Sequence, residues 1–450
     1  MSNQGLVSIM IFLIVMIFTG CISLSFDEGE MEDLGKEIVE LLIKQEYEVV
    51  YDEYGANEWI ESTSLSSVIS NWEKQIDLEG RYVQLTSIDA SERGEHSVVE
   101  IEIQYTNMSV DVRMIFNKEQ ELVGLHRASG EVSAVVPKSI IEEELIVGEG
   151  TKFELEGVLT MPSEIDQALP AVVLVHGSGP SDRDSAVHSY KPFRDIAWGL
   201  AERGIAVLRY DKRTYSYGDQ LTPEEMTHFT VHEETVEDAV RASNLLKSDE
   251  RIDSTNVYVA GHSQGGMLAP RVDDSGGYFA GIMILAGSPR PMWEIVYDQN
   301  IAFLDSDVID ESERESLITE VEQHYELAQR LDDLSLKEIE STQVFGLPAY
   351  YLLDMDKYNP VELLEGSSKP VLILHGETDF QVTYEADFLA WQEALESREK
   401  VTFKSYPQLN HFFIESRGDN QGTIGEYEQP GIVADEVIED MAQWVWIQSD

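Results

Sequence analysis

The stretch VYVAGHSQGGMLAP, Val257–Pro270, joins four residues suited to a buried strand to a glycine-rich corner and then to a helix-like run. Its centre, Gly261-His262-Ser263-Gln264-Gly265, has the form G-x-S-x-G. Between a strand and a helix this pattern is typical of a nucleophile elbow, a strained turn that holds a serine hydroxyl above the end of a sheet. Glycine-rich turns also serve packing, so the interpretation depends on whether the chain supplies a base, an acid and an oxyanion site.

Short apolar segments recur on both sides of this corner and predict parallel strands covered on both faces. Helical stretches such as FRDIAWGLAERG and VHEETVEDAVRASNLLKSD lie between them. The pattern predicts a doubly wound, mostly parallel α/β sheet, interrupted by a largely helical insertion at about 289–368 that is placed to act as a lid. The predicted strands are 171–176, 205–210, 257–260, 281–286, 370–375 and 401–406.

Two side chains downstream of the serine have the types and order that nucleophilic catalysis requires. A serine hydroxyl needs a base to take its proton, and the base needs a carboxylate that orients it. Asp379 lies just past the strand at 370–375, and His411 lies in the loop after the strand at 401–406. Because the carboxyl ends of parallel strands gather at one edge of a sheet, we expect Ser263, Asp379 and His411 to meet there.

An oxyanion site is predicted from two backbone N–H groups. The loop after the strand at 171–176 reads His176-Gly177-Ser178-Gly179. The N–H groups of Ser178 and of Gln264, the residue after the nucleophile, are the expected donors to the developing negative charge. We expect His176 to brace the loop rather than to react.

From about residue 138 to 450 the chain resembles the α/β-hydrolase superfamily, and more narrowly its serine esterase-like members, also described as dienelactone-hydrolase-like or serine-aminopeptidase-like. The matching motifs are HGSGPSDRD, LRYDKR, GHSQGG, LAGSPRP, HGETDFQV and LNHFF. Dienelactone hydrolases themselves use a cysteine where this chain has Ser263, so their substrate does not carry over. Residues 30–130 form a predicted small α+β domain, similar to an uncharacterised domain found ahead of such hydrolases.

These observations predict a serine hydrolase that cleaves carboxylic esters through an acyl-enzyme on Ser263, with no metal or organic cofactor. A thioesterase, a peptidase and a catalytically silent cell-envelope binding protein are the alternatives. Tyr350 and Tyr351 are candidate substrate contacts, although a lid core explains them equally well. Arg183, between two aspartates, is a candidate for binding a substrate carboxylate, with a local ion-pair network as the alternative.

The N-terminal segment, residues 1–26, predicts a signal peptide or membrane anchor. Gly5–Phe26 carries no charge and would span about 33 Å as a helix, enough to cross a bilayer. Thr19-Gly20-Cys21 resembles a lipoprotein cleavage box, which makes Cys21 a candidate lipidation site. An uncleaved anchor and a lipidated cysteine both leave the protein extracytoplasmic and tethered to the membrane.

The chain is strongly acidic, with 85 Asp and Glu against 31 Lys and Arg and a formal net charge of −54 in 450 residues. Such a surface repels nucleic acid, so we expect none as a partner. At about 1 M salt the Debye length falls to roughly 3 Å, which screens the self-repulsion. Because the carboxylates are spread along the chain, we predict a halophilic protein rather than an acidic binding tail. The sequence does not predict an oligomeric state.

Overall fold

The computed structural model of the protein describes residues 27–73, 79–106, 108–129, 136–188, 190–222, 226–304, 309, 311–418, 420–429 and 431–449. The chain forms two compact units, a small N-terminal one and a larger C-terminal one. The predicted anchor at residues 1–26, with Cys21, lies outside the described residues. In the described part of the chain, no helix combines the length and the apolar character needed to cross a membrane.

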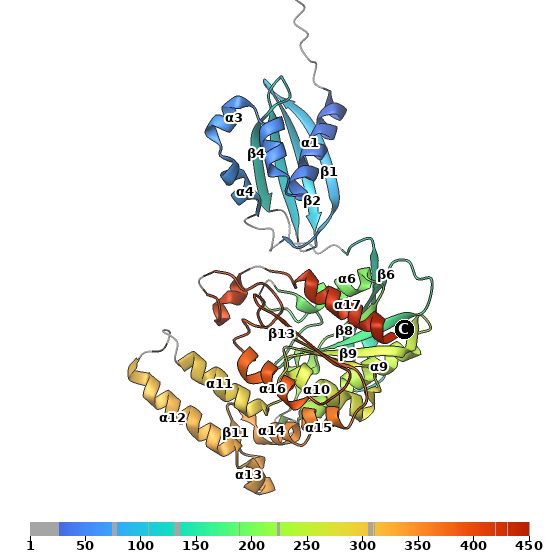
Figure 1. Ribbon diagram of the computed structural model, residues 1–450, viewed down its shortest axis with the longest axis vertical. Coiled ribbons are helices and arrows are strands. Elements are labelled where there is room, and N and C mark those ends of the chain that lie inside the picture. Colours follow the sequence, from blue (N-terminus) through green and yellow to red (C-terminus); the bar gives the residue numbers. More distant parts are fainter. Residues whose placement is uncertain are drawn as a thin grey trace, which may run out of the picture. The chain divides into compact units, whose positions relative to one another are not determined.

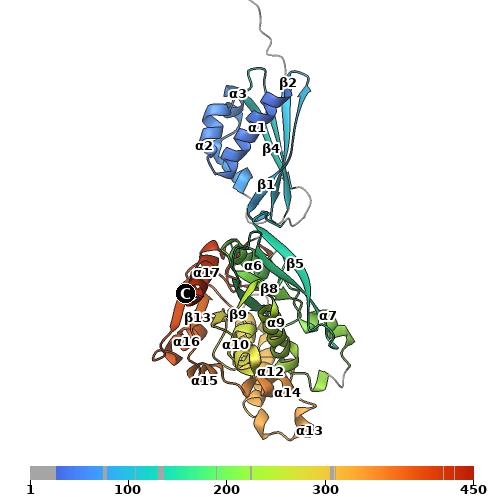
Figure 2. The ribbon, with the colours of Figure 1, turned by 90° about the vertical axis from the view of Figure 1, so that its right-hand side faces the viewer.

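The small unit is a four-stranded antiparallel sheet in the order β1-β2-β3-β4, with helices on one face (Figures 1 and 2). Strand β3 alternates buried and exposed residues, so Val112 and Met114 face the helices while Asp111 and Arg113 face solvent. The elements are α1 Glu28–Ile43, α2 Tyr47–Val49, a π-helical turn Val50–Tyr54, α3 Asn57–Ser62, α4 Leu65–Glu73, β1 Tyr82–Arg93, β2 His96–Tyr105, β3 Ser109–Phe116 and β4 Leu122–Ser129.

Helix α1 packs closely on this sheet because a glycine lies in the contact. A Cβ atom at Gly35 would come within 2.6 Å of Val99 Cγ1 on β2. Ile38, Val39 and Leu42 continue the buried face of the helix. The predicted small α+β domain is therefore confirmed, and β1 is a strand that the sequence pattern did not predict.

The large unit contains an eight-stranded sheet in the order β14-β13-β10-β9-β7-β8-β6-β5. Strands β5 and β6 form an antiparallel hairpin and β6 pairs antiparallel with β8, whereas the other pairs are parallel. This confirms the predicted, mostly parallel α/β sheet. The strands are β5 Ile140–Val147, β6 Leu155–Pro162, β7 Leu169–Val175, β8 Ala206–Tyr210, β9 Ile252–His262, β10 Ile282–Leu285, β13 Val371–Gly376 and β14 Val401–Tyr406.

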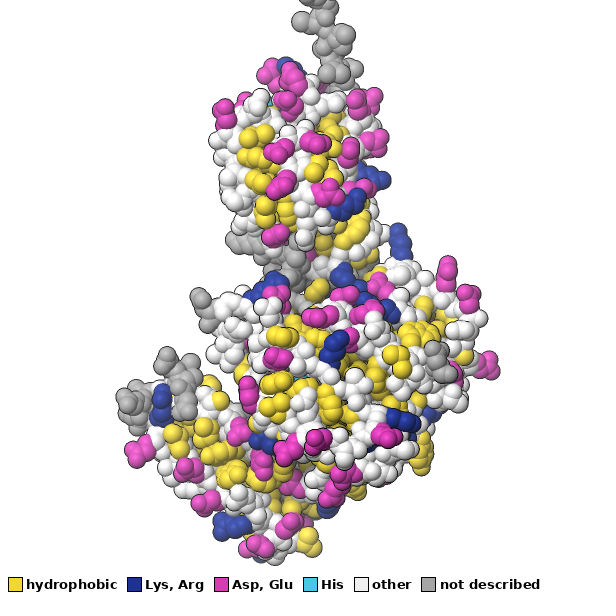
Figure 3. Space-filling model, in the orientation of Figure 1, with side chains coloured by type: hydrophobic (Ala, Val, Ile, Leu, Met, Phe, Trp, Pro, Cys, Tyr) yellow, Lys and Arg dark blue, Asp and Glu magenta, His cyan; other side chains and the backbone are white. Residues whose placement is uncertain are grey.

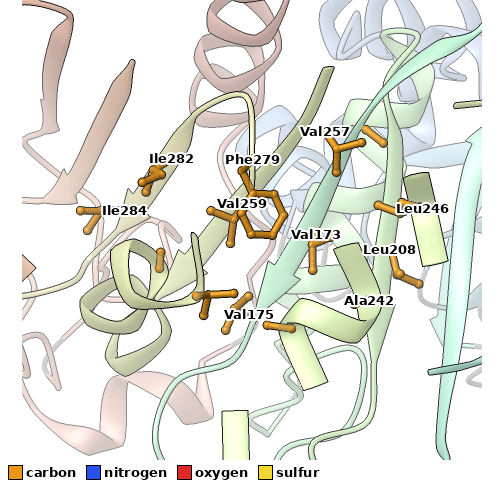
Figure 4. Packing of buried hydrophobic residues seen from close by; sticks show 14 of the residues in the cluster. Val173, Val175, Leu208, Ala242, Leu246, Val257, Val259, Phe279, Ile282 and Ile284 are labelled. Carbon is orange, nitrogen blue, oxygen red and sulfur yellow. The ribbon is translucent and has the colours of Figure 1, made fainter. Parts of the chain in front are cut away.

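Alternate residues of the central strands point to opposite faces of the sheet and pack into two separate hydrophobic cores. In β7, Val172 and Leu174 pack toward α6 (Pro192–Glu202) and α17 (Asp435–Ser449). Val173 and Val175 pack toward α9 (Glu237–Ser248), α10 (Gln264–Val272) and α16 (Leu389–Ala394). Figure 4 shows this second core, where Ala242 and Leu246 of α9 lie over β7, β8 and β9. Burial on both faces explains why these strands are almost uninterrupted apolar runs.

The insertion after β10 is mainly helical, as expected from the sequence, but it also contains a two-stranded hairpin. Its own small core includes Leu331, Val344 and Leu352. Tyr351 and Met355 of α14 instead pack against Met267 and Leu268 of α10, the helix that follows the serine. The insertion comprises α11 Met292–Leu304, α12 Glu311–Ala328, a 3₁₀ turn Leu331–Asp333, α13 Leu336–Ile339, β11 Gln343–Val344, β12 Leu347–Pro348, α14 Ala349–Asp356 and α15 Pro360–Glu365.

Short helical turns complete the large unit and lie mostly in the loops that follow the strands. They are α7 Arg213–Tyr217, the 3₁₀ turns Gly218–Gln220 and Ile424–Glu428, and the π-helical turns His232–Val236, Asp273–Gly277 and Tyr384–Phe388.

Candidate active site

Ser263 lies at a strained corner between the end of β9 and the start of α10. Its backbone angles are φ 54° and ψ −120°, a conformation that a residue with a side chain rarely adopts. Its N–H donates to Leu285 O at 2.8 Å, and its carbonyl accepts from Gly266 N at 2.9 Å. Such strain costs on the order of 1–3 kcal/mol and persists only where the surroundings hold it.

The two glycines that flank the serine are required by close backbone contacts. A Cβ atom at Gly261 would lie 2.0 Å from Gly265 O, and one at Gly265 would lie 2.3 Å from Val175 O. Gly261 therefore lets the chain reverse sharply, and Gly265 lets the start of α10 rest on the end of β7. The tight turn at Ser263 therefore requires glycine two residues before the serine and two residues after it.

Asp379 and His411 are joined directly in the structure. His411 Nδ1 lies 2.6 Å from Asp379 Oδ2, and both side chains are buried. Asp379 Oδ1 accepts from the N–H groups of Gln381 at 2.8 Å and Val382 at 3.0 Å. Burial alone would raise the pKa of Asp379, but the neighbouring His411, its hydrogen bond, His375 and the Val382 N–H together hold that pKa below its ordinary value. The carboxylate is therefore ionised and fixed in direction.

The loop that carries His411 is fixed by contacts on both sides. Asn410 Oδ1 accepts from the N–H groups of Phe412 at 3.0 Å and Ile414 at 3.2 Å. His262, the residue before the serine, places its Nε2 2.9 Å from the carbonyl oxygen of His411. A carbonyl only accepts, so His262 Nε2 carries the proton. Burial, with the nearby His411, lowers the pKa of His262 to about 3, which keeps its ring neutral.

The sheet thus brings the three predicted residues to one edge. Ser263, Asp379 and His411 follow β9, β13 and β14, which run parallel with β10 between β9 and β13. The rings of His262 and His411 lie 4.6 Å apart, so the elbow contacts the loop that carries His411. Ser263 is partly exposed, whereas His262 and Gln264 on either side of it are buried.

The loop after β7 lies against the elbow, where the predicted oxyanion donors are found. A Cβ atom at Gly177 would lie 3.1 Å from Ser263 Cβ, so the residue before Ser178 lies against the Ser263 side chain. Gln264 is the first residue of α10, so its N–H has no acceptor within the helix and lies at the positive end of the helix dipole.

His176 holds this loop in shape through contacts with its neighbours. Its Nε2 lies 3.0 Å from Asp182 O, and its ring packs against Phe193 and Tyr210. Burial, with the charge of Lys212, lowers the pKa of His176 to about 3, so the ring is neutral. This is the bracing arrangement expected from the sequence.

The candidate substrate contacts have other partners in the structure. Tyr351 Oη donates to Glu234 Oε2 at 2.6 Å and accepts from Gln264 Nε2 at 2.9 Å. The ring of Tyr350 lies 5.2 Å from that of His228. Their roles in binding substrate stay predictions.

Arg183 lies in the ion-pair network that the sequence offered as the alternative to substrate binding. Its guanidinium donates to Asp211 Oδ1 at 3.0 Å and to Glu156 Oε2 at 2.5 Å. These two carboxylates raise the pKa of Arg183, against the opposing effect of partial burial. A role in binding a substrate carboxylate also stays a prediction.

Sequence reasoning did not identify His262 and Asn410 as residues that fix the loop of His411. Both stand next to a predicted catalytic residue, and that adjacency was the only available signal. It could not distinguish a supporting side chain from a bystander, because the contacts cross 149 residues of sequence in the case of His262 and His411.

Two family models and a characterised relative match this chain. A family described as the alpha/beta hydrolase family matches residues 172–420, and a protein family of unknown function, DUF3887, matches residues 35–125. Esterase EstD of Thermotoga maritima is 32% identical over 388 residues, which cover 85% of this chain and 87% of the relative.

Solved structures show more distant similarity. Est1E from Butyrivibrio proteoclasticus is 17% identical, with a TM-score of 0.42 over 68% of this chain and 98% of its own. A puromycin-hydrolyzing peptidase of Mycobacterium tuberculosis is 16% identical, with a TM-score of 0.44 over 82% of this chain and 48% of its own.

Proposed function

Since the chain belongs to the alpha/beta hydrolase family, we propose that it is a serine carboxylesterase with Ser263, His411 and Asp379 as its catalytic residues. At the level of reaction class, the related esterase and the family match confirm the predicted hydrolase of esters. The observation that supports the assignment of residues is the 2.6 Å contact between His411 and Asp379 at the sheet edge where Ser263 forms the strained corner.

In the proposed mechanism, the Ser263 hydroxyl attacks the ester carbonyl carbon while its proton moves to His411 Nε2. Asp379 stabilises the resulting imidazolium through Nδ1 and keeps the neutral ring in the tautomer that can accept. The carbonyl oxygen gains negative charge and accepts hydrogen bonds from the N–H groups of Ser178 and Gln264. His411 then gives its proton to the departing alkoxide, which leaves Ser263 acylated.

The second half of the reaction repeats these steps with water. His411 takes a proton from water as the oxygen attacks the acyl carbonyl, the same two N–H groups hold the oxyanion, and the proton returns to Ser263 Oγ. The products are a carboxylic acid and an alcohol. Each oxyanion donor of this kind is typically worth about 10²–10³ in rate.

The test is a series of p-nitrophenyl esters from acetate to palmitate, assayed at low and at molar salt, together with labelling by a fluorophosphonate probe. We expect turnover and labelling of the wild type, and neither in Ser263→Ala. Ser248→Ala, at an exposed serine at the end of α9, is the matched control and should behave as wild type. No turnover of any ester at either salt, or labelling that survives Ser263→Ala, would refute the assignment.

Assays of the same enzyme with other substrates distinguish the alternatives to ester cleavage. Acyl thioesters and peptide p-nitroanilides, compared with the esters by kcat/KM, report thioesterase and peptidase activity. A folded wild type that is neither labelled nor active on any of the three would be the silent binding protein.

We propose further that the protein is extracytoplasmic and tethered to the membrane through residues 1–26. The support is the uncharged segment Gly5–Phe26 and the small residues before Cys21. Intact-mass analysis of protein purified from membranes tests this. A chain that begins at a lipid-modified Cys21, or a full-length chain retained in the membrane, is expected, and an unmodified chain found only in the soluble fraction would contradict it.

Adaptation to salt is a further proposal. The support is the net charge of −54, with Asp and Glu side chains spread over the visible face of each unit (Figure 3). Because screening weakens repulsion among surface carboxylates, we expect the melting temperature to rise between 0.1 and 2 M KCl. A melting temperature that is flat or falls over this range would contradict the proposal.

A further inference from the structure

A chain of buried polar side chains connects the two residues that supply the proposed oxyanion donors. It begins at Lys212, in the loop after β8, whose Nζ donates to Gly177 O at 2.8 Å. Gly177 O and the N–H of Ser178 belong to one peptide group. The ammonium group therefore contacts the opposite end of the dipole whose N–H is the proposed donor.

Glu234 holds the lysine from the other side. Its Oε1 lies 3.3 Å from Lys212 Nζ and accepts from Thr214 Oγ1 at 3.2 Å. The carboxylate belongs to the π-helical turn His232–Val236, which directly precedes α9. Turns of this kind are rare and are often found at functional sites, because they redirect one side chain out of the regular helical path.

The chain ends at the second donor residue. Glu234 Oε2 accepts from Tyr351 Oη at 2.6 Å, and Tyr351 Oη accepts from Gln264 Nε2 at 2.9 Å. Burial, with the charge and the hydrogen bond of Glu234, raises the pKa of Tyr351, so the phenol keeps its proton and donates to the carboxylate. Since Tyr351 lies on α14, the insertion takes part in the network.

The burial of Lys212 indicates that the contact is specific. Its side chain is 2% exposed, and those of Glu234 and Gln264 are 6% and 2% exposed. Burial lowers the pKa of Lys212, while the charge and the hydrogen bond of Glu234 act in the opposite direction. A buried ammonium is strongly disfavoured unless it is paired, and here its two partners are a carboxylate and the oxyanion-loop carbonyl.

The next residue in the chain provides a contrast. Arg213 is equally buried, but its guanidinium donates to Asp238 Oδ1 at 2.6 Å and to Glu237 Oε2 at 2.7 Å, both on α9. Among the described residues, Arg213 makes no hydrogen bond or ion pair with the loop after β7 or with the elbow. The adjacent buried cations Lys212 and Arg213 therefore pair with different carboxylates. Of the two, only Lys212 contacts the peptide group beside Ser263.

We propose that Lys212 is a positioning residue for the oxyanion site, holding the Gly177–Ser178 peptide with its N–H turned toward the reacting carbonyl and polarising it. Glu234 and Tyr351 fix the ammonium and tie it to Gln264. This deepens the proposed function and rests on it. The effect is larger in the transition state than in the substrate complex, because only there does the carbonyl oxygen carry full negative charge.

The test compares two matched double variants, each of which replaces a buried ion pair by neutral side chains. Lys212→Met/Glu234→Gln removes the pair that contacts the oxyanion loop, and Arg213→Met/Asp238→Asn removes the pair that does not. We expect the first to lower kcat about 10- to 100-fold with KM changed less than about threefold, since an indirect effect should fall below the loss of a whole donor. The second should lower stability and leave the kcat of folded enzyme within about twofold of wild type.

A transition-state analogue distinguishes positioning from general damage. A trifluoromethyl ketone adds to the serine and places an oxyanion in the same site, so its Ki should rise by the factor by which kcat/KM falls in Lys212→Met/Glu234→Gln. A wild-type kcat, a change confined to KM, an unchanged Ki, or an equal loss of kcat in the Arg213 control would overturn the proposal.

If the Lys212 double variant does not fold, Tyr351→Phe decides, because it removes a single oxygen from the network. It should lower kcat about three- to tenfold with little change in KM, while a wild-type kcat or a change in KM alone would overturn the role given to the network. Failure of this inference is distinct from failure of the proposed function. In the latter case the wild type itself shows neither labelling nor turnover.

Discussion

Mild acid should destabilise this protein through two histidines that are folded in the neutral form. His176 and His262 are buried, and burial, with a neighbouring cationic or histidine side chain, lowers the pKa of each from 6.5 to about 3. Below pH 6.5 the unfolded chain binds a proton at each site and the folded chain does not. Their contribution to stability is therefore complete above pH 6.5 and is lost as the pH falls toward 3.

The size of the effect follows from the two pKa values. One pKa unit corresponds to about 1.4 kcal/mol, and pH 5 lies about 1.5 units below the ordinary value, so each histidine lowers the free energy of unfolding by about 2 kcal/mol. Together they remove about 4 kcal/mol between pH 7.5 and pH 5, a large part of the roughly 5–15 kcal/mol typical of a domain. Between pH 6 and 4 the slope attributable to each is about 1.4 kcal/mol per pH unit.

The assay is urea unfolding at constant temperature and salt, followed by tryptophan fluorescence at several pH values between 4.5 and 7.5. His176→Gln and His262→Gln keep a side-chain donor but cannot bind the proton, so each should reduce the slope by about 1.4 kcal/mol per pH unit. The exposed His228→Gln is the matched control. Slopes in the two buried variants that equal the wild-type slope would refute the argument that these rings are folded as neutral groups.

Three further outcomes follow from the geometry of the site. Asp379→Asn should lower kcat about 10³- to 10⁴-fold with intact folding, because an amide in contact with His411 Nδ1 stabilises the wrong tautomer, and steady-state kinetics with circular dichroism checks this. Gly265→Ala should destabilise the large unit by more than about 3 kcal/mol in urea unfolding, since its Cβ would lie 2.3 Å from Val175 O, and a stable, active variant would contradict that contact. Gln381→Ala should leave the Asp379–His411 contact intact and change kcat less than about threefold, because Gln381 contributes only its backbone N–H to the carboxylate and Ala keeps that group.

The linear pattern of this chain predicted most of the large unit. Apolar runs marked the parallel strands, because a strand that is buried on both faces of the sheet carries apolar residues at nearly every position. The order of Ser263, Asp379 and His411 could be predicted because each follows a strand end, and strand ends of a parallel sheet share an edge. The strand β1, the short hairpin of β11 and β12, and the π-helical turn at Glu234 were not predicted, since their periodicity is weak or irregular.

By itself the sequence determined most of the elements of the large unit, the position of the sharp corner and the candidate side chains for the chemistry, because propensity, glycine and apolar periodicity act over a few residues. Only the tertiary structure decided what surrounds them. Glu234 and Tyr351 are 117 residues apart, and Gln264 and Tyr351 are 87 apart, yet they form one buried network. Which polar groups meet inside a protein depends on how its helices and strands pack. Packing brings together residues that lie far apart in the chain, so the local sequence around each residue does not indicate its partner.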